Sequence, residues 1–511
     1  MDIGTSSVRS ALYDDAGNVL PRTMVKNERS LTATDDGGAE IHADEAFEQV
    51  VAAVDEVLKK SEKVKGDIGH VAASSFWHSL VGVDAKGKAT TKVYGWADTR
   101  SRDHVATLRK KFDEMTVHNR TGTRFHSSFW PAKLLWIRKE FPEVFKKTAK
   151  WLSFSDFVMA RLIDGKQLPN ISTCRHMEDV TLFGLRTYYH EERIPAFTSI
   201  SMASATGIFD IRKCEWDAEL VKFLGLTPDR LPQVVRYNHD TFTLNTKFKL
   251  RWERLNAAKI FPAIGDGAAN NIGAGCVRKT KAALMIGTSG AMRVAYKGEP
   301  PDKIPNGLWC YRIDRQTVII GGALSDGGGL YRWLKDTLRL GRDNDVEAEI
   351  AKRAPDGHGL VFLPFLAGER STGYHETATG SIIGLRTATD TIDVVQAALE
   401  SVAYRFAEIF DQLSDICRIH EIVASGGALR ESPVWTQIIA DVLGRNMSLP
   451  DTREASSRGA VLLALETIGK IDNIDKISTP KGAHFTSNKT RQSLYKKARK
   501  CHDDQYIKFL G

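Results

Sequence analysis

One tetrapeptide occurs twice in this chain, once in each half. Ile-Gly-Thr-Ser stands at residues 3–6 and again at 286–289, and an alternating, strand-like stretch follows each copy, at 8–13 and 293–296. A glycine followed by two hydroxyl residues at a strand end makes a tight turn that presents N–H and O–H groups to anionic oxygens. Two such turns predict two similar domains that face one polyphosphate from opposite sides, as in a two-domain ATP-dependent enzyme.

Length and element order support two domains. A chain of 511 residues is too long for one core. Strand-like and helix-like segments alternate, which indicates an α/β protein with mixed sheets. We place the boundary near residue 255, between a sugar-binding domain at 1–255 that carries the first phosphate turn and a nucleotide-binding domain at 256–511. No flexible linker separates the halves, so we expect a cleft between them that holds the substrates.

The composition of the chain limits the kinds of partner that this protein is expected to bind. The six cysteines are scattered without a CxxC pair, and neither a membrane-length apolar run nor a signal peptide is present, so we expect a reduced, cytoplasmic protein with no membrane partner. The net charge of +8 is diffuse. Its densest run, 489–500, has few aromatic residues and indicates the solvated face of a terminal helix, so we expect no nucleic-acid partner.

Periodicity predicts the elements that carry the motifs. Apolar residues at helical spacing predict helices at 43–60, with Asp44 as a candidate cap, and at 393–413. Short apolar runs predict strands at 71–75, 258–264, 282–287 and 422–427, and the last three lead into glycine turns.

A stretch at 82–89 nearly spells a P-loop but fails two requirements. Its last position is Ala89, which has no hydroxyl to hold Mg²⁺, and Asp84 to Gly87 lies between two strand-like stretches, which indicates a hairpin turn. We therefore reject this segment as a phosphate site.

Phosphoryl transfer needs a phosphate cradle, a metal and a base near the attacking hydroxyl. Asp266, between two glycines at a strand end, is the candidate base, although Gly-Asp-Gly alone is also typical of an ordinary turn. Asp2 and Asp266 are the candidate Mg²⁺ residues, with Asp2 acting through metal-bound water. Arg9 either reaches a phosphate or is a surface strand arginine. The candidates for nucleotide binding are Gly4, Thr5, Ser6, Ser7, Arg9, Gly287, Thr288, Ser289, Gly328, Gly426, Gly427 and Ala428.

An acceptor pocket is expected near two aromatic stretches of the first half. Polar side chains beside an aromatic wall suit a polyhydroxylated ligand. The alternative for the histidine is a satisfied core residue. The candidates for acceptor binding are Trp77, His78, Ser79, Trp96, Asp98, Arg100 and Asp266.

Together these residues resemble the FGGY family of carbohydrate kinases over nearly the whole chain. The most specific part is Gly380 to Leu385 followed by 393–400, which looks like the family's C-terminal signature; the motifs at 2–7, 265–267, 287–290 and 425–428 follow in the family's order. The resemblance implies two actin-like ATPase (ribonuclease H-like) domains with a central catalytic cleft, ATP and Mg²⁺ as cofactors, Asp266 as catalytic base, and a small-molecule sugar or sugar acid as substrate.

Within the family, stretches at 78–80, 96–101, 133–136 and 363–370 look most like gluconate kinases. Gluconate carries a carboxylate, so its site should contain a cation or a fork of donors. The candidates, among which the sequence does not choose, are Arg100, Arg124, His126 and Lys133.

Three departures from the family pattern leave alternatives open. The first strand before Asp2 is nearly absent, Trp130 replaces a small residue or proline, and the stretch at 174–198 matches no motif. The alternatives are a sister kinase for xylulose, ribulose or glycerol, and, in a different class, an actin-like or chaperone-like ATPase that acts as a binding module. A homodimer is left open.

Overall fold

The computed structural model describes residues 1–29, 31–164, 196–340, 343–451 and 454–510. Contacts between Cα atoms divide the chain into two compact units. The first comprises residues 1–108, 127–267 and 460–471, and the second comprises 109–126, 268–459 and 472–511. Each unit is therefore assembled from three separate stretches, and the division near residue 255 stays a prediction.

The first unit is built on a five-stranded mixed sheet in the order β16-β7-β1-β2-β3. β1 runs parallel to β7 and antiparallel to β2, and β7 runs parallel to β16. The carboxyl ends of β1, β7 and β16 consequently lie at one edge of this sheet. The strands are β1 (Asp2–Ile3), β2 (Ser7–Ser10), β3 (Val25–Glu28), β7 (Ser74–Ser75) and β16 (Ile264–Gly265).

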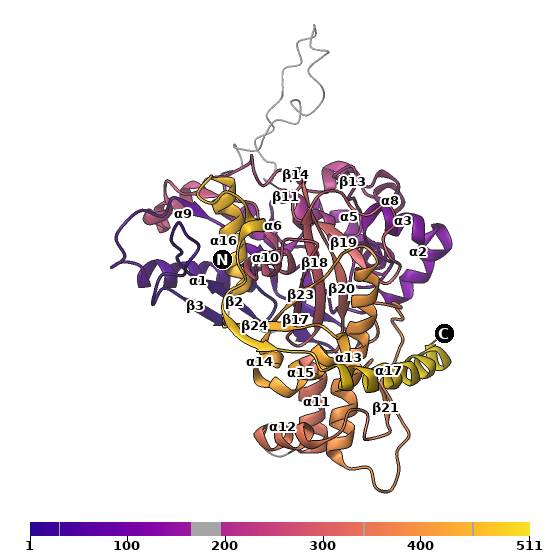
Figure 1. Ribbon diagram of the computed structural model, residues 1–511. Helices are drawn as coiled ribbons and strands as arrows, with labels where there is room; N and C mark the ends of the chain where they lie inside the picture. Colours follow the sequence, from indigo (N-terminus) through magenta and orange to yellow (C-terminus); the bar gives the residue numbers. More distant parts are fainter. Residues whose placement is uncertain (30, 165–195, 341–342, 452–453, 511) are drawn as a thin grey trace. The chain divides into compact units, whose positions relative to one another are not determined.

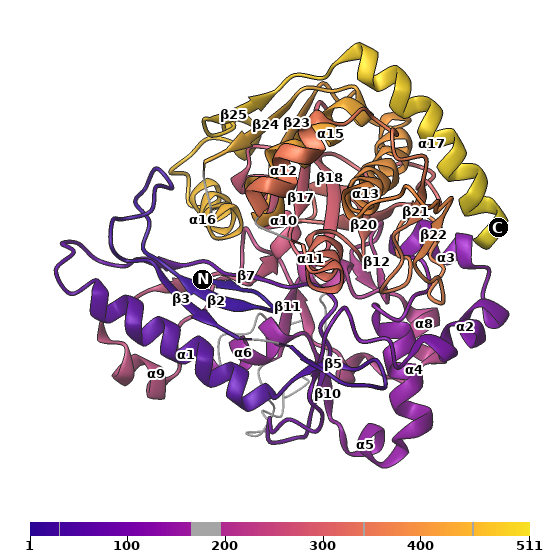
Figure 2. The same cartoon turned by 90° about the horizontal axis from the view of Figure 1, so that it is seen from below.

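Helix α1 (Ala43–Lys60) confirms the helix predicted at 43–60. Its apolar stripe, which includes Phe47, Val50 and Val54, is buried against β2 and β3. The predicted cap was wrong, because the N-cap position is His42, whereas Asp44 lies in the first turn and pairs with Arg161 at 2.6 Å. In Figure 2, α1 and α16 (Ala455–Thr467) are drawn on opposite sides of β2 and β3.

Short strands and helices complete the first unit. They are β4 (Thr32–Ala33), β5 (Ala39–Ile41), β6 (His70–Val71), β8 (Val81–Val83), β9 (Val93–Tyr94), α2 (Val105–Lys111), α4 (Trp130–Glu140), α5 (Pro142–Lys147), β10 (Lys150–Leu152), α6 (Phe154–Leu162), β11 (Phe197–Ser199), α7 (Ile200–Ser204), β12 (Phe209–Asp210), β13 (Glu215–Trp216), α8 (Ala218–Phe223), β14 (Gln233–Val235), α9 (Thr246–Arg251) and β15 (Lys259–Ile260).

The second unit is built on a seven-stranded sheet in the order β19-β20-β18-β17-β23-β24-β25, part of which is visible in Figure 1. β17 pairs antiparallel with β18 and parallel with β23, so β17 and β23 end at the same edge. The strands are β17 (Lys281–Ile286), β18 (Gly290–Lys297), β19 (Trp309–Arg312), β20 (Thr317–Leu324), β23 (Glu421–Ser425), β24 (Met447–Pro450) and β25 (Gly482–Phe485).

Helix α13 (Thr391–Ser414) is the centre of the helical layer in the second unit and confirms the helix predicted at 393–413. A reciprocal capping box between Asp390 and Asp393 starts it, and seventeen of its residues are buried. The remaining elements of this unit are α3 (Glu114–Thr121), α11 (Gly328–Leu338), α12 (Asp343–Lys352), β21 (Val361–Leu363), β22 (Ser381–Ile383), α14 (Gly427–Glu431), α15 (Pro433–Leu443) and α17 (Lys489–Leu510).

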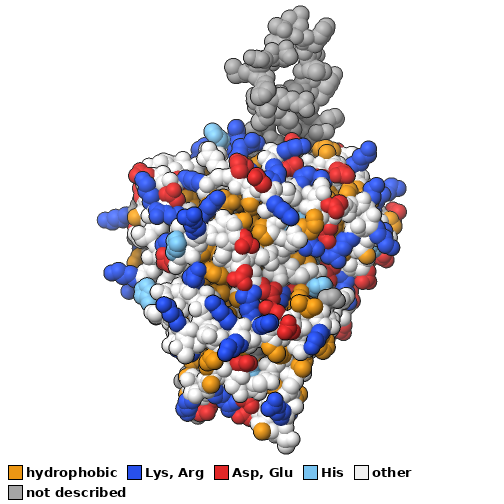
Figure 3. All heavy atoms as spheres, turned by 45° about the vertical axis from the view of Figure 1, so that its right-hand side comes forward, with side chains coloured by type: hydrophobic (Ala, Val, Ile, Leu, Met, Phe, Trp, Pro, Cys, Tyr) orange, Lys and Arg blue, Asp and Glu red, His pale blue; other side chains and the backbone are white. Residues whose placement is uncertain are grey.

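Several other predictions from the sequence can be compared with the structure. The rejected P-loop is a turn, in which the amide of Asp84 donates to the carbonyl of Lys88 at 2.9 Å. The basic run at 489–500 is helical, as predicted, and lysine, arginine and acidic side chains are interspersed on the face shown in Figure 3. Within the described part of the chain, no helix is both long and apolar enough to cross a membrane. Of the stretch at 174–198, residues 174–195 lie outside the described residues.

Candidate functional site

The first phosphate turn joins β1 to β2. The amide of Gly4 donates to the carbonyl of Ser7 at 3.0 Å, which closes the hairpin. Thr5 is half-buried and Ser6 is exposed, whereas Ser7 is buried. The turn therefore leaves the side chains of Thr5 and Ser6 accessible, while Ser7 is part of the sheet.

Asp2 and Arg9, both predicted to act at this turn, pair with each other. Arg9 Nη1 lies 3.3 Å from Asp2 Oδ2, and the hydroxyl of Ser74 donates to Asp2 Oδ1 at 2.8 Å. Each carboxylate oxygen of Asp2 thus has one partner inside the protein. A contact with Mg²⁺ through metal-bound water, which keeps both partners, stays a prediction.

Arg29 lies behind the same turn and was not singled out from the sequence. Its Nη2 donates to the carbonyl of Gly4 and its amide donates to the carbonyl of Ser6 at 3.0 Å. The guanidinium stands over the rings of Phe76 and Phe154, at 5.6 and 5.2 Å from their centroids. Burial lowers the pKa of Arg29 to about 10, so the side chain stays charged at neutral pH. A buried cation therefore supports the first phosphate turn.

Asp266, the predicted base, is the first residue of α10 (Asp266–Gly273) and follows β16 directly. It is half-buried, and the amide of Gly267 donates to its Oδ1 at 2.7 Å. Because β16 and β1 both flank β7 in parallel, Asp266 leaves the sheet at the edge where the Gly4 turn begins. The carboxylate and the first phosphate turn thus belong to one sheet edge.

The indole of Trp77 packs against the backbone that precedes Asp266. A Cβ at Gly265 would lie only 1.8 Å from this indole, so only glycine allows the approach. Ser201 holds both segments: Trp77 Nε1 donates to its carbonyl at 3.1 Å, and the amide of Gly265 donates to its hydroxyl at 3.0 Å. The predicted acceptor wall therefore adjoins the predicted base.

His78 has a defined tautomer. Its Nδ1 lies 2.7 Å from the carbonyl of Ala205, and a carbonyl only accepts, so Nδ1 carries the proton and Nε2 is an acceptor in the neutral ring. The backbone adopts the left-handed region, with φ 65°, and the ring packs edge-on against Phe129. A hydrogen-bond acceptor of this kind suits a sugar hydroxyl, and the contact itself stays a prediction.

Ser79 and Trp130 serve packing. Ser79 is fully buried; its hydroxyl accepts from the amide of Phe154 at 3.0 Å, and its carbonyl accepts from Trp130 Nε1 at 2.9 Å. Trp130 also stacks on Trp216. Trp130 therefore supports the turn between β7 and β8 that carries His78, and a sugar contact by Ser79 stays a prediction.

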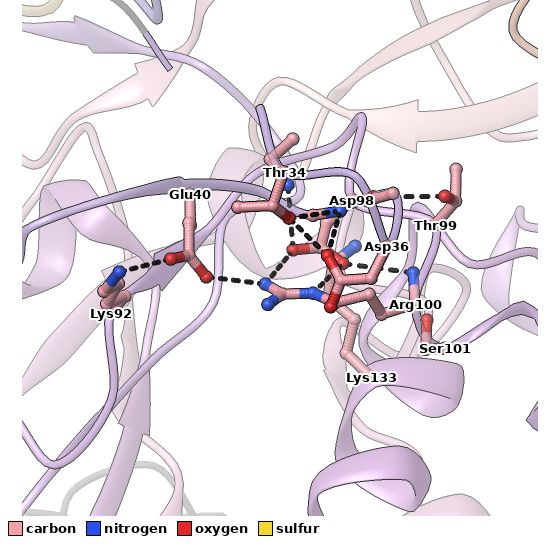
Figure 4. Close-up of polar contacts among 12 residues, drawn as sticks. Thr34, Asp36, Glu40, Lys92, Asp98, Thr99, Arg100, Ser101 and Lys133 are labelled. Carbon is pink, nitrogen blue, oxygen red and sulfur yellow. Dashed lines mark hydrogen bonds and ion pairs between the residues drawn. The ribbon is translucent and has the colours of Figure 1, made fainter. Parts of the chain in front are cut away.

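Arg100 forms the centre of a polar cluster shown in Figure 4. Its Nε donates to Asp98 Oδ1 at 3.1 Å, and its Nη2 donates to Glu40 Oε2 at 2.7 Å. The guanidinium also stands over the rings of Tyr94 and Trp136. Burial alone would lower the pKa of Arg100, but the bonds to the two carboxylates outweigh it and raise the pKa. The charge of Arg100 is thus balanced inside the protein.

Asp98 connects this cluster to a neighbouring loop. It is 1% exposed and accepts from the amide of Ala39 at 3.2 Å, and the hydroxyl of the next residue, Thr99, donates to the carbonyl of Gly37 at 3.1 Å. Trp96 is half-buried. The geometry supports a positioning role for Asp98 and Arg100, and their contact with a sugar stays a prediction.

The other candidate cations also have partners inside the protein. The buried ammonium of Lys133 donates to the carbonyls of Ser127 and Ser128 at 2.7 and 2.6 Å. Arg124 and His126 belong to the second unit. They pair with Glu114 at 3.1 Å and with Glu376 at 3.5 Å, respectively. The geometry does not select one of these cations as the partner of a carboxylate.

The second phosphate turn joins β17 to β18. Its Gly287 amide donates to the carbonyl of Ser289 at 2.9 Å, and Thr288 is exposed. A neighbouring glycine segment bonds to it: the amide of Gly328 donates to the carbonyl of Gly287 at 2.8 Å, and that of Gly329 donates to the carbonyl of Thr288 at 2.9 Å. The start of α11 is therefore fixed to the turn.

A third glycine segment packs on the same place. A Cβ at Gly328 would lie 2.8 Å from the Cβ of Ala428, and a Cβ at Gly426 would lie 2.1 Å from the carbonyl oxygen of Ile286. Gly426 has φ 102°, a conformation that favours glycine, and the following Gly427 is exposed. The predicted nucleotide-binding residues at 287–289, at Gly328 and at 426–428 thus meet at the carboxyl edge of β17 and β23.

The described residues contain one cluster with metal-ligand geometry, and its hydrogen bonds oppose metal binding. Asp356, His358 and Glu400 place ligand atoms within 4.8 Å of one another. However, the amide of Leu360 donates to His358 Nδ1 at 2.9 Å, so Nε2 carries the proton and donates to Glu400 at 3.2 Å. The imidazole therefore has no lone pair left for a metal.

The sequence matches the "FGGY family of carbohydrate kinases, N-terminal domain" over residues 1–273 and the corresponding "C-terminal domain" over residues 282–467. Among curated proteins, a gluconokinase from Bacillus licheniformis is 28% identical over 492 residues, which cover 94% of this chain and 89% of the relative.

Solved structures extend the likeness to the whole fold. A ligand-bound xylulose kinase and a gluconate kinase, both from Lactobacillus acidophilus, superpose with TM-scores of 0.84 and 0.83. Each is 24% identical, and each match covers 99% of this chain and 96% of the other. The predicted fold class, α/β with two actin-like ATPase domains, is thereby confirmed. At this identity the two structures establish the fold and leave the substrate open.

Proposed function

The chain belongs to the FGGY family of carbohydrate kinases, and we propose that it phosphorylates gluconate. As a member of this family it is a sugar kinase, which uses ATP and a small-molecule sugar. The gluconokinase relative and the motifs at 78–80, 96–101, 133–136 and 363–370 support gluconate as the acceptor.

Asp266 is the general base of the proposed reaction. The acceptor oxygen attacks the γ-phosphorus, its proton passes to the Asp266 carboxylate, and the bond to the leaving ADP breaks. The single observation that carries this assignment is the position of Asp266, at the sheet edge of the Gly4 turn and beside the indole of Trp77. In this scheme Nε2 of His78 accepts a hydrogen bond from a hydroxyl group of the sugar and so orients the sugar for phosphorylation.

In the proposed reaction, the phosphate oxygens accept hydrogen bonds from the hydroxyl groups of Thr5 and Ser6 and from those of Thr288 and Ser289. The Gly426 segment receives the purine. Bound Mg²⁺ would neutralise the charge that develops on the β- and γ-phosphates. Asp2 and Asp266 would hold it through its water ligands, because carboxylates suit Mg²⁺ and Asp2 already has two protein partners.

Asp266→Asn tests the base. We expect kcat in a coupled ADP-release assay to fall by about 10²–10⁴-fold, the usual contribution of a general base, with an unchanged Tm. The matched control is Asp103→Asn, which changes an exposed aspartate of the same unit and should leave kcat unaltered. Sugar phosphorylation by Asp266→Asn at the wild-type rate would disprove the assignment.

A panel of acceptors tests the substrate. We expect the highest kcat/KM with gluconate among gluconate, xylulose, ribulose and glycerol. A neutral acceptor such as xylulose is the second candidate, because each of the four candidate cations already bonds to a carboxylate or a carbonyl of the protein. Strong stimulation of ADP release by xylulose, without stimulation by gluconate, would favour this second candidate. ATP turnover without any sugar, together with filament formation, would instead favour the actin-like or chaperone-like class.

A further inference from the structure

Strand β16, which leads directly into Asp266, is the edge strand of its sheet. It stands at the end of the order β16-β7-β1-β2-β3, so among the described residues only one of its sides pairs with a strand. The amide of Ile264 donates to the carbonyl of Ala73 at 3.0 Å, which directs the backbone groups of Ile264 toward β7. Because these groups alternate in direction along a strand, those of Ala263 and Gly265 point to the outer side. Both residues are buried, and buried backbone groups need hydrogen-bond partners.

Two serine hydroxyls supply these partners. The hydroxyl of Ser199, the last residue of β11, donates to the carbonyl of Ala263 at 2.6 Å. The hydroxyl of Ser201, in α7, accepts from the amide of Gly265 at 3.0 Å. A neighbouring parallel strand would offer one donor and one acceptor to the same two backbone groups. The two serines thus take the place of a sixth strand where the sheet passes into the candidate base.

The segment that carries these serines is itself held by the core of the first unit. Strand β11 runs parallel to β14, with Phe197 opposite Gln233, and the ring of Phe197 stacks on Phe242 with the centroids 3.9 Å apart. All five residues of α7 are buried, and the amide of Met202 donates to the hydroxyl of Ser199 at 3.1 Å. The two hydroxyls therefore project from a backbone whose position is fixed.

Ser201 contacts the base segment and the acceptor wall through different groups. Its hydroxyl binds Gly265, whereas its carbonyl accepts from Trp77 Nε1 at 3.1 Å. Gly265 immediately precedes Asp266, so the hydroxyl acts one residue away from the base. Removal of the hydroxyl alone should therefore release Asp266 and leave the indole of Trp77 in place.

We propose that Ser201 is a positioning residue for catalysis, and that its hydroxyl fixes the end of β16 from which Asp266 reaches the acceptor. This inference rests on the proposed role of Asp266 as general base. A base must lie within hydrogen-bond reach of the proton that it abstracts, and a misplacement of about 1 Å can cost about 100-fold in rate. Loss of the Ser201 hydroxyl should consequently lower kcat rather than raise KM.

Hydrogen exchange tests the contact without reference to activity. In the unaltered protein, the Gly265 amide should exchange within about tenfold of the rate of the Ile264 amide, although Gly265 donates to a side chain and Ile264 donates to a strand. In Ser201→Ala, exchange at Gly265 should become faster by about tenfold or more, while exchange at Ile264 stays unchanged. Rapid exchange at Gly265 in the unaltered protein, or equal exchange there in both proteins, would overturn the proposal.

Steady-state kinetics test the consequence for catalysis. We expect Ser201→Ala to lower kcat by about tenfold or more and to change KM for ATP and for the sugar by less than about twofold. Ser61→Ala is the matched control, because it removes another fully buried hydroxyl of the same unit, at the end of α1. This control should lower Tm about as much as Ser201→Ala and leave kcat unaltered. An equal loss of kcat in both variants would mean that Ser201 contributes only to stability, which contradicts the proposal.

A double variant separates this inference from the proposed function. If Ser201 acts through Asp266, adding Ser201→Ala to Asp266→Asn should lower kcat by less than about twofold beyond the loss in Asp266→Asn alone. Two losses that multiply would show that Ser201 acts by another route, against the proposal. A wild-type rate of Asp266→Asn would instead disprove the base, and with it the role of Ser201, while exchange at Gly265 would still report whether the contact exists.

Discussion

The two phosphate turns share four residues but differ in what supports them. The Gly4 turn follows a two-residue strand, and charged side chains lie beside it, namely Asp2, Arg9 and Arg29. The Gly287 turn follows a six-residue strand, and two other glycine segments, 326–329 and 426–428, pack against it. The first turn is supported by side-chain charge, and the second by close backbone packing.

This difference shows that the same motif can be stabilised in two ways, which differ in their sensitivity to an added side-chain atom and to the loss of a charge. A Cβ at Gly4 would meet the carbonyl oxygen of Ser7 at 3.1 Å, which a small shift relieves. A Cβ at Gly426 would meet the carbonyl oxygen of Ile286 at 2.1 Å, which requires the backbone to move. We therefore expect loss of charge to harm the first turn and added atoms to harm the second.

The largest expected effect comes from Gly426→Ala. The residue combines φ 102° with the overlap on Ile286, so the variant should lose about 100-fold in kcat/KM for ATP. Gly4→Ala is the matched control and should lose less than about tenfold. Steady-state kinetics with varied ATP give both values, and equal losses in the two variants would contradict the contrast between the turns.

An intermediate effect is expected from Arg29→Met, which keeps much of the side-chain volume and removes the charge. Hydrogen bonds from a charged donor are worth about 1.5–3 kcal/mol, so kcat should fall by roughly 10- to 100-fold, with a smaller change in KM for the sugar. Arg29→Lys retains the cation and should recover part of the loss. If Lys and Met behave alike, the charge is not what supports the Gly4 turn.

The smallest effect is expected from Asp326→Asn at the second turn. Burial raises the pKa of Asp326 from 3.8 to about 6. Hydrogen bonds from the backbone amides of Ala367 and Leu366 act in the opposite direction but are outweighed. The folded state thus binds more protons than the unfolded state between pH 4 and 6, so stability falls as pH rises through this window. Because Asn carries no charge, the variant should exceed wild type in Tm by about 5 °C at pH 7.5 and match it at pH 4. A Tm advantage that is the same at both pH values would contradict this assignment.

Elements with strong local patterns were predictable from the sequence. Helices α1 and α13 and strands β17 and β23 follow apolar periodicity and end in glycine turns. The run at 71–75, predicted as one strand, forms two, because β6 pairs with β15 whereas β7 pairs with β1 and β16. Such a change of partner depends on distant residues and leaves no local pattern.

The candidate site divides in the same way. Glycines and the aspartate at strand ends were predictable, because a tight turn needs particular residue types. Arg29 was missed because a single arginine in a polar stretch gives no periodic signal. Its partner Gly4 also lies 25 positions away, so no local pattern connects the two residues. Glu40 was missed for the same reason: its bond to Arg100 spans 60 residues. The sequence does not identify the cation that binds the substrate carboxylate, because the partners of each side chain in the fold, rather than its spacing in the sequence, decide whether its charge is available.

The interleaving of the two units has a consequence for synthesis on the ribosome. Residues 460–471, which belong to the first unit and contribute Ala464 and Leu465 to the walls of an apolar cavity in it, leave the exit tunnel after nearly the whole chain. The unit that begins at Met1 therefore stays incomplete until only residues 472–511 are left to emerge, and a nascent chain must keep its first sheet partly covered until then. Chaperone dependence of this protein should accordingly centre on its amino-terminal half.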